Sequence, residues 1–477
     1  MKKKLLPLLL ILAFLLPTLT SCSLISPKKK LYVYNWGEYM SLGDEGGVHT
    51  NHAFEEWYYE TYGEEIEVVY SVFSSNEEMY AKMRNGSSKI DVIFPSEYMV
   101  ERLIAEDMIR PLDFTEIPAY ASSIEKRFQE LATAPYCVPY TYGYFGLIYD
   151  EDLDEYLRDE NGEISWRVLW NEIPGGKDYS GQILTFNNNR DAFGIAQFIL
   201  NYEHAWQNGK KPGETDWYVN TTDKTRWDEA FELLRLQKDC LQAYVMDEIY
   251  NKMEGGAALL AAYYAGDYFT MVDVNERLCF AYPKEGTNFF YDAMCIPKNS
   301  KNSVEAQRYI NFLLGGTEGE SLDVAIENAE YIGYSSPNVR VTTNLDYLAD
   351  MVDDEDGYGE EALSILYPEC DLETLTVMVE NYIAWRDEQE DDYDIADYPG
   401  VHPTVDVFRK EDSDFVAYIY ENLDNETLEY FNGRWEALKL ESAACGDIYV
   451  ISAVIVVVLL GGAVFYVLLR RYRRRFY

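Results

Sequence analysis

Histidine and closely spaced cysteine are scarce in this sequence. There are 4 histidines in 477 residues, and none belongs to an H-E-x-x-H motif. None of the 7 cysteines forms a C-x-x-C pair. Zinc centres are built from such spacings, so the sequence predicts no metal site, and we expect no cofactor.

Positive charge is also in short supply. The chain has 40 Lys and Arg against 83 Asp and Glu, for a formal net charge of −43. All of the acidic residues lie between residues 23 and 447. Such a field repels nucleic acid and concentrates cations. Most of these acids, including the run at 387–394, are expected to be a solvated surface. The charge therefore excludes nucleic acid as a partner and favours a cationic ligand.

The N-terminus has the pattern of a short signal sequence. Three lysines precede the apolar run 5–16, and Leu19-Thr-Ser-Cys22 follows. The end of this pattern resembles a bacterial lipobox, which implies removal of residues 1–21 and a diacylglycerol on the sulfur of Cys22. An ordinary signal peptide with an incidental cysteine is the alternative. Residues 22–30 would then form a short tether.

The C-terminus contains an apolar segment without charge at 448–469. Its length suits a transmembrane helix. Five arginines follow within the tail 470–477, and positive charge stays on the cytoplasmic side. We therefore expect the preceding residues to lie outside the cell, on the cell membrane. A sensor that signals through this helix is an alternative, although its tail would need a separate signalling partner.

Alternating apolar and longer helical patterns indicate an α/β fold. Strands are predicted at 31–35, 65–71, 90–94, 183–186, 280–283 and 293–297. Helices are predicted at 53–62, 75–85, 99–106, 190–202, 227–242, 247–254 and 304–314. The early β-α-β-α-β-α order predicts a largely parallel sheet with helices on both faces. Residues 136–149 are extended and aromatic, as a strand crossing between lobes would be. The region 340–440 is expected to be acidic and mostly helical.

Aromatic and acidic residues gather where the first strand ends. Trp36, Glu38 and Tyr39 follow the apolar strand directly. Ligands of open α/β sheets bind beside the carboxyl ends of strands. An aromatic face beside a carboxylate suits an organic cation. A core strand followed by an aromatic loop is the plainer interpretation.

Nine short segments, taken together, resemble a known family. The chain is similar to the extracellular spermidine/putrescine-binding proteins of bacterial polyamine ABC transporters. Each segment alone is a weak signal, but they occur in the family's order over residues 31–370. They are Tyr34-Asn-Trp-Gly-Glu-Tyr39, Ser75-Asn-Glu-Glu-Met-Tyr-Ala-Lys82, Asp91-Val-Ile-Phe-Pro-Ser96, Val138-Pro-Tyr140, Ser165-Trp-Arg-Val-Leu-Trp170, Tyr264-Ala-Gly-Asp267, Tyr282-Pro-Lys-Glu-Gly286 with Asp292, Ile310-Asn-Phe-Leu-Leu314 and Ile332-Gly-Tyr-Ser-Ser-Pro-Asn338.

The resemblance implies a two-lobed periplasmic-binding-protein fold of type II with crossover strands. It implies capture of putrescine or spermidine in an aromatic and acidic cleft between the lobes, followed by delivery to an ABC permease driven by an ATPase. It implies no catalysis. The expected lobes are residues 31–139 with 282–336, and residues 140–281 with 337–440.

The resemblance also names the first-lobe contacts. Trp36 and Tyr39 would supply an aromatic wall and a hydroxyl. Ser96 and Tyr98, on the turn after the third strand, match further contacts. A helix cap is the alternative role for Ser96.

Three acidic or aromatic positions match family contacts in the second lobe. Asp191 matches an acid that pairs with an amine, although a helix-start acid favoured by the dipole is the alternative. Tyr264 stands where the family usually has tryptophan. Asp267 matches an acid of the putrescine-selective relatives.

Three later residues complete the expected site. Asp292 follows two aromatic residues and precedes a buried strand, where a bare acid needs a partner. Phe290 would be the facing wall. Tyr334 matches a cleft aromatic, with a core tyrosine as the alternative.

The sequence departs from the family pattern at two of its positions. Gly37 replaces a usual hydroxyl residue, and Asn188 stands where some spermidine binders have aspartate. The Asp267 match leans slightly toward putrescine. An insertion after residue 370 leaves the last family contact unassigned. Two rivals stay open: a receptor of the same fold for another small ligand, and an extracellular carbohydrate-active enzyme.

Overall fold

The chain divides into two compact units. The computed structural model describes residues 28–440 apart from 44–46, 87–88, 212–213, 215–216, 317–320, 353–357, 360, 390–392 and 411–412. Unit 1 holds the described residues up to Thr141, with Asp292–Ile332 and Ser336–Thr342. Unit 2 holds Tyr142–Tyr291, Gly333–Ser335 and the described residues from Thr343 onward.

The predictions for the two termini concern residues beyond this description. Within the described residues, no helix has the length and apolar character needed to cross a membrane. The expected signal sequence at 1–21, the lipid site at Cys22 and the expected transmembrane helix at 448–469 all lie outside those residues.

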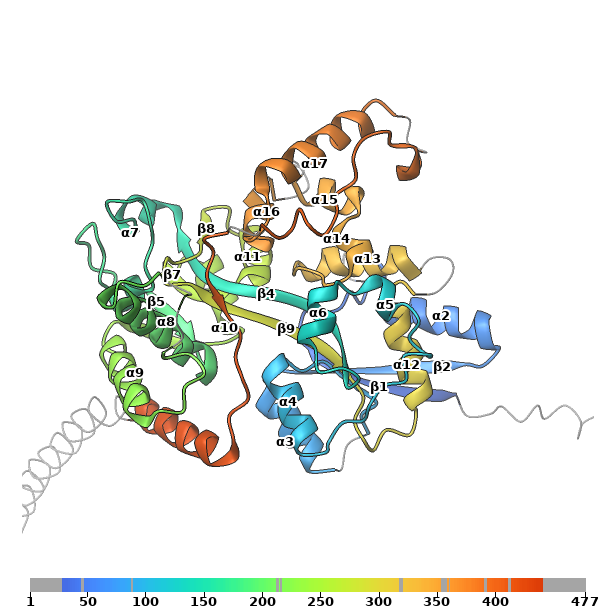
Figure 1. Cartoon of the computed structure of the whole chain (residues 1–477), viewed down its shortest axis with the longest axis horizontal. Helices are drawn as coiled ribbons and strands as arrows, with labels where there is room; N and C mark the ends of the chain where they lie inside the picture. The colour runs from blue at the N-terminus through green and yellow to red at the C-terminus, as the bar shows by residue number, and fades with distance from the viewer. Residues whose placement is uncertain are drawn as a thin grey trace, which may run out of the picture. The chain divides into compact units, whose positions relative to one another are not determined.

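Unit 1 begins with the predicted β-α-β-α-β-α order (Figure 1). These six elements are β1 (Lys29–Trp36), α2 (Thr50–Tyr62), β2 (Ile66–Phe73), α3 (Asn76–Arg84), β3 (Val92–Ile93) and α4 (Glu97–Ala105). β1 lies parallel to both β2 and β3, with Lys29 opposite Ile66 and Val33 opposite Val92. The predicted parallel arrangement is therefore confirmed for these three strands.

Further helices complete unit 1, and one later strand extends its sheet. The helices are α5 (Tyr120–Ser123), α6 (Lys126–Leu131), α12 (Ser303–Leu313), α13 (Ser321–Ile332) and α14 (Val339–Thr342). The end of β9 (Thr287–Cys295) lies antiparallel to β3, with Cys295 opposite Ile93. Within unit 1 the strand order is thus β2-β1-β3-β9.

The start of α3 shows how local sequence fixes an element of unit 1. The Ser75 hydroxyl accepts a hydrogen bond from the Glu78 backbone N–H at 3.1 Å, as the predicted capping box requires. The Glu78 carboxylate reaches back to the backbone N–H of Ser74 at 2.9 Å rather than to that of Ser75. The helix therefore begins at the predicted residue, with the returning bond one position earlier.

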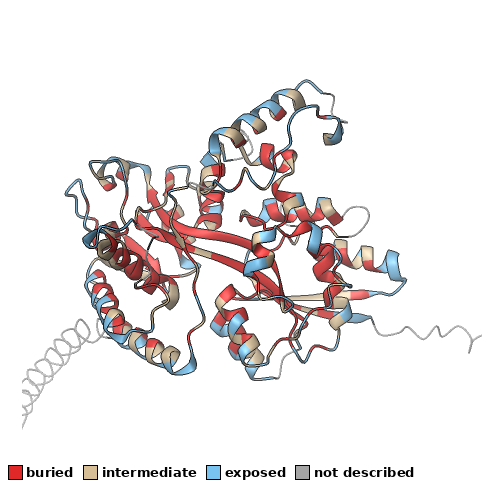
Figure 2. Cartoon of the chain, viewed as in Figure 1, coloured by how far each residue is buried: buried red, intermediate tan, exposed pale blue. Residues whose placement is uncertain are grey.

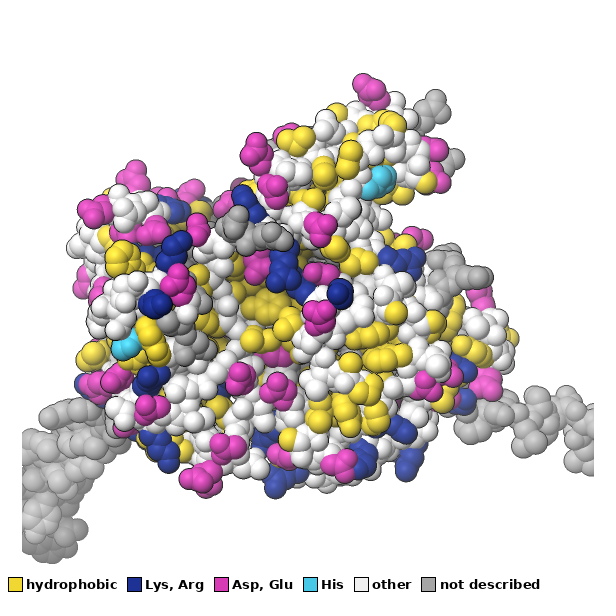
Figure 3. All heavy atoms as spheres, viewed as in Figure 1, with side chains coloured by type: hydrophobic (Ala, Val, Ile, Leu, Met, Phe, Trp, Pro, Cys, Tyr) yellow, Lys and Arg dark blue, Asp and Glu magenta, His cyan; other side chains and the backbone are white. Residues whose placement is uncertain are grey.

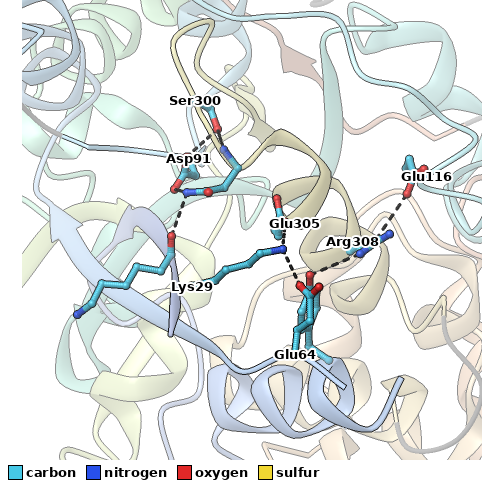
Figure 4. A network of polar contacts seen from close by, with 10 residues as sticks. Lys29, Glu64, Asp91, Glu116, Ser300, Glu305 and Arg308 are labelled. Atoms are coloured by element: carbon cyan, nitrogen blue, oxygen red, sulfur yellow. Dashed lines mark hydrogen bonds and ion pairs between the residues drawn. The ribbon is translucent and has the colours of Figure 1, made fainter. Parts of the chain in front are cut away.

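Polar contacts attach the start of β1 to the rest of unit 1 (Figure 4). Lys29 Nζ lies 2.7 Å from Glu64 and 2.8 Å from Glu305 on α12. Asp91, just before β3, accepts hydrogen bonds from Ser300 at 2.6 Å and from Asn302 at 2.9 Å. Because Asp91 is buried and these bonds are satisfied, we assign it to the framework rather than to ligand binding.

The strands of unit 2 follow the order β4-β7-β5-β6, with β8 beside β4. Its strands are β4 (Cys137–Asp150), β5 (Ile183–Phe186), β6 (Leu241–Val245), β7 (Leu260–Tyr264), β8 (Leu278–Ala281) and β10 (Ala417–Tyr418). β5 lies parallel to β6 and β7, whereas β4 lies antiparallel to β7 and β8. α8 (Asn189–Gln207) packs against α9 (Lys224–Gln237) and β5. The helices are η2 (Glu151–Leu153), α7 (Asp154–Leu157), η3 (Trp166–Trp170), α8 (Asn189–Gln207), α9 (Lys224–Gln237), α10 (Glu248–Glu254) and α11 (Ala265–Val272).

Two long strands contain the boundaries between the units. β4 is buried from Cys137 to Tyr149, and β9 is buried except at Phe289 (Figure 2). The boundary in β4 falls after Thr141, two residues beyond the expected one. The boundary in β9 falls after Tyr291, ten residues beyond the expected one. Residues 282–291 thus lie in unit 2, because β9 begins well before residue 293 and its first residue pairs with β10 of unit 2.

The third boundary also differs from the expected division after residue 336. Gly333–Ser335 lie in unit 2, and the chain then returns to unit 1 for Ser336–Thr342. The backbone of Tyr142 is bridged to that of Ser335 within unit 2, whereas Ile124 is bridged to Asn338 within unit 1. These pairings explain why so short a segment changes unit twice.

The acidic region beyond residue 340 is helical at its beginning and its end. Its helices are α15 (Leu345–Val352), α16 (Glu361–Leu366) and α17 (Leu372–Arg386), and residues 425–440 are also helical. Between them, the described residues of 387–424 hold η4 (Ile395–Asp397) and β10 in otherwise irregular chain. The prediction of a mostly helical region is wrong for this middle part.

Candidate functional site

A buried carboxylate on β9 is the centre of a polar cluster in unit 1. Asp292 is 4% exposed. Its Oδ1 accepts a hydrogen bond from Ser96 Oγ at 2.7 Å, and its Oδ2 accepts one from Tyr39 Oη at 2.7 Å. The strand end that carries Asp292 is bridged to Ser96 through the backbone. Residues far apart in the chain thus converge on one acid.

The environment of Asp292 leaves its charge without a cationic partner. Burial raises the pKa of Asp292 from 3.8 to about 6, and the hydrogen bonds from Ser96 and Tyr39 oppose that rise. Among the described residues, no lysine, arginine or histidine forms an ion pair with Asp292. A carboxylate that is charged at neutral pH, buried and unpaired by a cation is costly in an empty protein. It is therefore suited to a cation supplied from outside.

Ser96 and Asn76 hold this acid in place. Ser96 precedes α4, but its side chain makes no cap bond to that helix. The alternative of a helix cap is therefore wrong, because the hydroxyl donates to Asp292 instead. Asn76 Nδ2 donates to Ser96 Oγ and to Tyr98 Oη at 3.0 Å each, and its Oδ1 accepts the Ser96 backbone N–H at 3.2 Å.

The aromatic residues after β1 take different roles in unit 1. Trp36 is half-buried, its indole N–H donates to the Phe94 carbonyl at 2.7 Å, and its ring lies 4.5 Å from that of Phe73. Tyr39 is buried, and its hydroxyl also lies 2.6 Å from Thr141 Oγ1. Trp36 thus offers an aromatic face, whereas Tyr39 offers a fixed hydroxyl.

Glu38 is directed away from this cluster. It is exposed, its φ is 48°, and its carboxylate accepts a hydrogen bond from Tyr331 at 3.0 Å. The acid that completes the cluster is Asp292, which is 253 residues away from Tyr39 in the chain.

A second cluster lies in unit 2, where β5 leads into α8 and β7 leads into α11. Asp191, in the first turn of α8, is 4% exposed and accepts a hydrogen bond from Tyr264 Oη at 2.6 Å. Burial and the nearby charge of Asp191 raise the pKa of Tyr264 well above 10, so this hydroxyl stays a donor. Asn188 caps α8 and also contacts the Tyr264 hydroxyl.

Asp267 is the other acid of unit 2. It lies in the first turn of α11 and accepts a hydrogen bond from Tyr334 Oη at 2.6 Å. The Tyr250 hydroxyl on α10 donates to its other oxygen. Burial, followed by the charge of Asp267, raises the pKa of Tyr250, which keeps this donor protonated. Two tyrosines therefore fix the orientation of one carboxylate.

Phe290 joins the two halves of the unit 2 cluster. Its ring lies 5.5 Å from that of Tyr264 and 6.1 Å from that of Tyr334. Gly266 allows this close packing, because a Cβ there would lie 2.3 Å from the Tyr334 ring. The result is a row of three aromatic rings between two carboxylates.

The ten expected site residues thus fall into two groups. Trp36, Tyr39, Ser96, Tyr98 and Asp292 belong to unit 1; Asp191, Tyr264, Asp267, Phe290 and Tyr334 belong to unit 2. Both groups combine carboxylates, tyrosine hydroxyls and aromatic rings, which is chemistry for holding an organic cation. Within the described chain, no group of three or more His, Cys, Asp or Glu side chains could hold a metal ion.

Sequence reasoning missed three residues of these clusters. Asn76 lies inside one of the family-like segments, but its position at the start of a helix gives no sign of its bonds to Ser96 and Tyr98. The residues next to Thr141 and Tyr250 in the sequence give no sign of their roles. The reason is that Thr141 contacts the distant Tyr39, and Tyr250 contacts Asp267 on another helix. A groove of about 850 Å³ along α17, lined among others by Asp371, Trp385 and Tyr398, contains none of the ten residues.

The sequence of this chain is similar to a family of known proteins and to several of its characterised members. Residues 87–329, about half of the chain, match the family model of bacterial extracellular solute-binding proteins. A spermidine/putrescine-binding periplasmic protein of Salmonella typhimurium is 30% identical over 319 residues, covering 66% of this chain and 79% of the relative. A putrescine-binding periplasmic protein of Escherichia coli is 25% identical over 331 residues, covering 67% of this chain and 81% of the relative.

Solved structures show the same fold. The substrate-binding protein of a spermidine/putrescine ABC transporter from Streptococcus pneumoniae aligns with a TM-score of 0.56 at 24% identity, covering 87% of this chain and 99% of the other. A lipoprotein of Treponema pallidum aligns with a TM-score of 0.53 at 17% identity, covering 86% of this chain and 99% of the other. The expected two-lobed α/β fold of periplasmic binding proteins is confirmed.

The family also decides between the classes of function that the sequence left open. Its members bind solutes for transport, so the expectation of a binding protein is confirmed and the extracellular enzyme is set aside. This chain belongs to the bacterial extracellular solute-binding proteins.

Proposed function

We propose that the chain binds putrescine or spermidine outside the cell and delivers it to the permease of an ABC importer. The curated relatives are named for binding these polyamines. The two clusters supply the chemistry that polyamines need, which is carboxylates for ammonium groups and aromatic rings for the methylenes between them.

Asp292 is the observation that carries this proposal. It is buried, its pKa of about 6 leaves it charged at neutral pH, and both of its oxygens already accept hydrogen bonds from neutral hydroxyls. An ammonium group would add a charged donor and compensate the buried negative charge. A neutral sugar or an anion would leave that charge unbalanced.

The remaining groups suit the rest of a diamine. Trp36 in unit 1 and Phe290 with Tyr334 in unit 2 offer rings to the alkyl stem. Asp191 and Asp267 are oriented by tyrosine hydroxyls. Each cluster offers an acid to an ammonium group, and Asp267 gives a slight preference for putrescine.

Titration calorimetry of the full-length chain tests this proposal. We expect one-to-one binding of putrescine, cadaverine, spermidine or spermine at micromolar or lower concentration. Asp292→Asn keeps the shape of the side chain but removes its charge, so affinity is expected to fall at least about tenfold. Asp113→Asn is the matched control, because Asp113 is an exposed acid of unit 1 whose side chain contacts Thr115, two residues away.

Two results would oppose the proposal. Absence of heat with all four amines, from folded protein that is free of ligand, would point to another cation in the same clusters. Equal affinity of the wild type and Asp292→Asn would remove Asp292 from the site.

We also propose how the protein is held at the membrane. The lipobox-like sequence supports a diacylglycerol on Cys22, and the uncharged segment 448–469 supports a C-terminal anchor with the tail 470–477 in the cytoplasm. Fatty-acid labelling followed by cell fractionation tests both. Cys22→Ala should lose the label, whereas truncation after residue 447 should keep it, and both should remain on the extracytoplasmic side.

A further inference from the structure

Two cysteines lie at the same end of neighbouring strands in unit 1. Cys137 is the first residue of β4, and Cys295 is the last residue of β9. The two strands are neighbours in the sheet order. The hydroxyl of Thr287, at the start of β9, donates to the carbonyl of Phe145 on β4. Because Thr287 lies eight residues before Cys295 and Phe145 eight residues after Cys137, strands paired antiparallel in this register place the two cysteines opposite each other.

The side chains of this pair are in contact. Both cysteines are free thiols with 0% exposure, and they lie close enough for the Cys137 side chain to act on that of Cys295. Burial, with the neighbouring Cys137, raises the pKa of Cys295 well above 9. Of the other described cysteines, Cys240 donates to the Trp170 carbonyl at 3.4 Å, and Cys279 and Cys370 belong to unit 2.

We propose that Cys137 and Cys295 form a disulfide bond when the chain folds outside the cytoplasm. Residues opposite each other on antiparallel strands have Cα atoms about 4.5–5.5 Å apart, which lies within the range that a disulfide bridges. Extracytoplasmic compartments are oxidising enough to form such bonds. The inference does not depend on which solute the protein binds.

Bond formation proceeds by thiol–disulfide exchange with a disulfide oxidant during folding, before the pair is buried. A thiolate of one cysteine attacks the disulfide of the oxidant and forms a mixed disulfide. The thiolate of the second cysteine then attacks this mixed disulfide and releases the remaining half of the oxidant as a thiol. One S–S bond forms in the protein, two S–H bonds are lost, and the oxidant is reduced to two thiols. Afterwards, burial protects the bond from reductants.

The position of the bond gives it a role in the unit 1 cluster. Thr141 lies four residues after Cys137 on β4, and Asp292 lies three residues before Cys295 on β9. Both contact the hydroxyl of Tyr39. A covalent link between the strands would hold these two partners of Tyr39 in register, before any ligand arrives.

Peptide mapping of the intact, exported chain tests the bond without any substitution. The protein is denatured, its free thiols are alkylated with iodoacetamide, and it is digested without reductant. We expect one linked peptide pair that contains Cys137 and Cys295, two hydrogens lighter than the sum of its parts and lost on treatment with dithiothreitol. Cys240, Cys279 and Cys370 should be alkylated. Alkylation of both Cys137 and Cys295, or linkage of either to a different cysteine, would overturn the proposal.

Thermal unfolding provides a second, independent test. Dithiothreitol present during unfolding should lower the melting temperature of the wild type by about 5 °C. The double variant Cys137→Ala/Cys295→Ala should show no such shift, whereas the matched control Cys240→Ala should keep it. A shift that persists in the double variant would show that the reductant acts elsewhere and would overturn the assignment.

Discussion

At the scale of single residues, Asp292 explains most about this protein. Burial works against its charge, and only neutral hydroxyls from Ser96 and Tyr39 offset that effect in the described chain. Such an arrangement destabilises the empty protein relative to one with a neutral residue there. Residues of this kind are typical of binding sites, where the ligand supplies the missing charge.

The raised pKa of Asp292 predicts a pH dependence of affinity. A polyamine pairs with the charged carboxylate, and in the empty protein that form is lost as the pH falls through about 6. At pH 5 about a tenth of the molecules would be competent, so affinity should be about tenfold lower than at pH 7 or above. Calorimetry across this range measures the effect.

Asp292→Asn is the control for this dependence. Its weaker binding should stay nearly constant between pH 5 and 7, because the titrating group is gone. Wild-type affinity that does not change over the same interval would show that Asp292 does not titrate near 6 or does not contact the ligand.

At the scale of elements, both clusters sit where strands end and helices begin. Ser96 follows β3 and opens α4, Asp191 follows β5, and Asp267 follows β7 in the first turn of α11. This is where open α/β sheets place their ligands. The strands fix the backbone, and the short turns after them are free to present side chains.

Close packing between α11 and the segment that carries Tyr334 predicts the effect of one methyl group. In Gly266→Ala, the new Cβ would lie 2.3 Å from the Tyr334 ring and would displace it from Asp267 and Phe290. Loss of a hydrogen bond to a charged acceptor should weaken putrescine binding about tenfold. Calorimetry measures the change.

Gly433→Ala is the matched control for this substitution. Gly433 lies in the helix at 425–440, and nothing is within 4 Å of a Cβ built there. Its affinity should equal that of the wild type. If Gly266→Ala also binds like the wild type while remaining folded, the Tyr334–Asp267 contact is not part of the site.

At the scale of the whole molecule, two features stand out: the excess of acidic residues and the passage of β4 and β9 through both units. Acidic side chains are spread over the face shown in Figure 3, with basic residues among them. In the described part of the chain the buried acids are Asp91, Glu97, Asp191, Glu285 and Asp292, so most acidic side chains there are solvated, as expected from the sequence. The net charge of −43 nevertheless surrounds the protein with a negative potential.

This potential predicts that association with polyamines depends on salt. Raising ionic strength from about 0.02 M to about 0.5 M shortens the screening length several-fold and should slow association. Spermidine, with three charges, should be slowed more than putrescine, with two. Stopped-flow measurement of intrinsic fluorescence would follow both. Association rates that do not change with salt would mean that the surface charge does not steer the ligand.

The sequence by itself determined the parallel start of unit 1, and it predicted which residues would form a binding site. Strand and helix periods, the capping box at Ser75 and the aromatic loop after β1 are local patterns, so they can be read from neighbouring residues. The ordered family segments then placed residues such as Ser96, Asp267 and Asp292 in a binding context.

Only the tertiary structure decided which partners each of these residues has. Ser96 and Asp292 are 196 residues apart, Tyr39 and Thr141 are 102 apart, and Tyr334 and Asp267 are 67 apart. The helix-cap role of Ser96 and the return of the chain to the first lobe at residue 282 looked equally sound in sequence. The structure differs on both points. Hydrogen bonds between distant segments fix where the Ser96 side chain points, and strand pairing between distant segments fixes where β9 begins. No local sequence pattern encodes either.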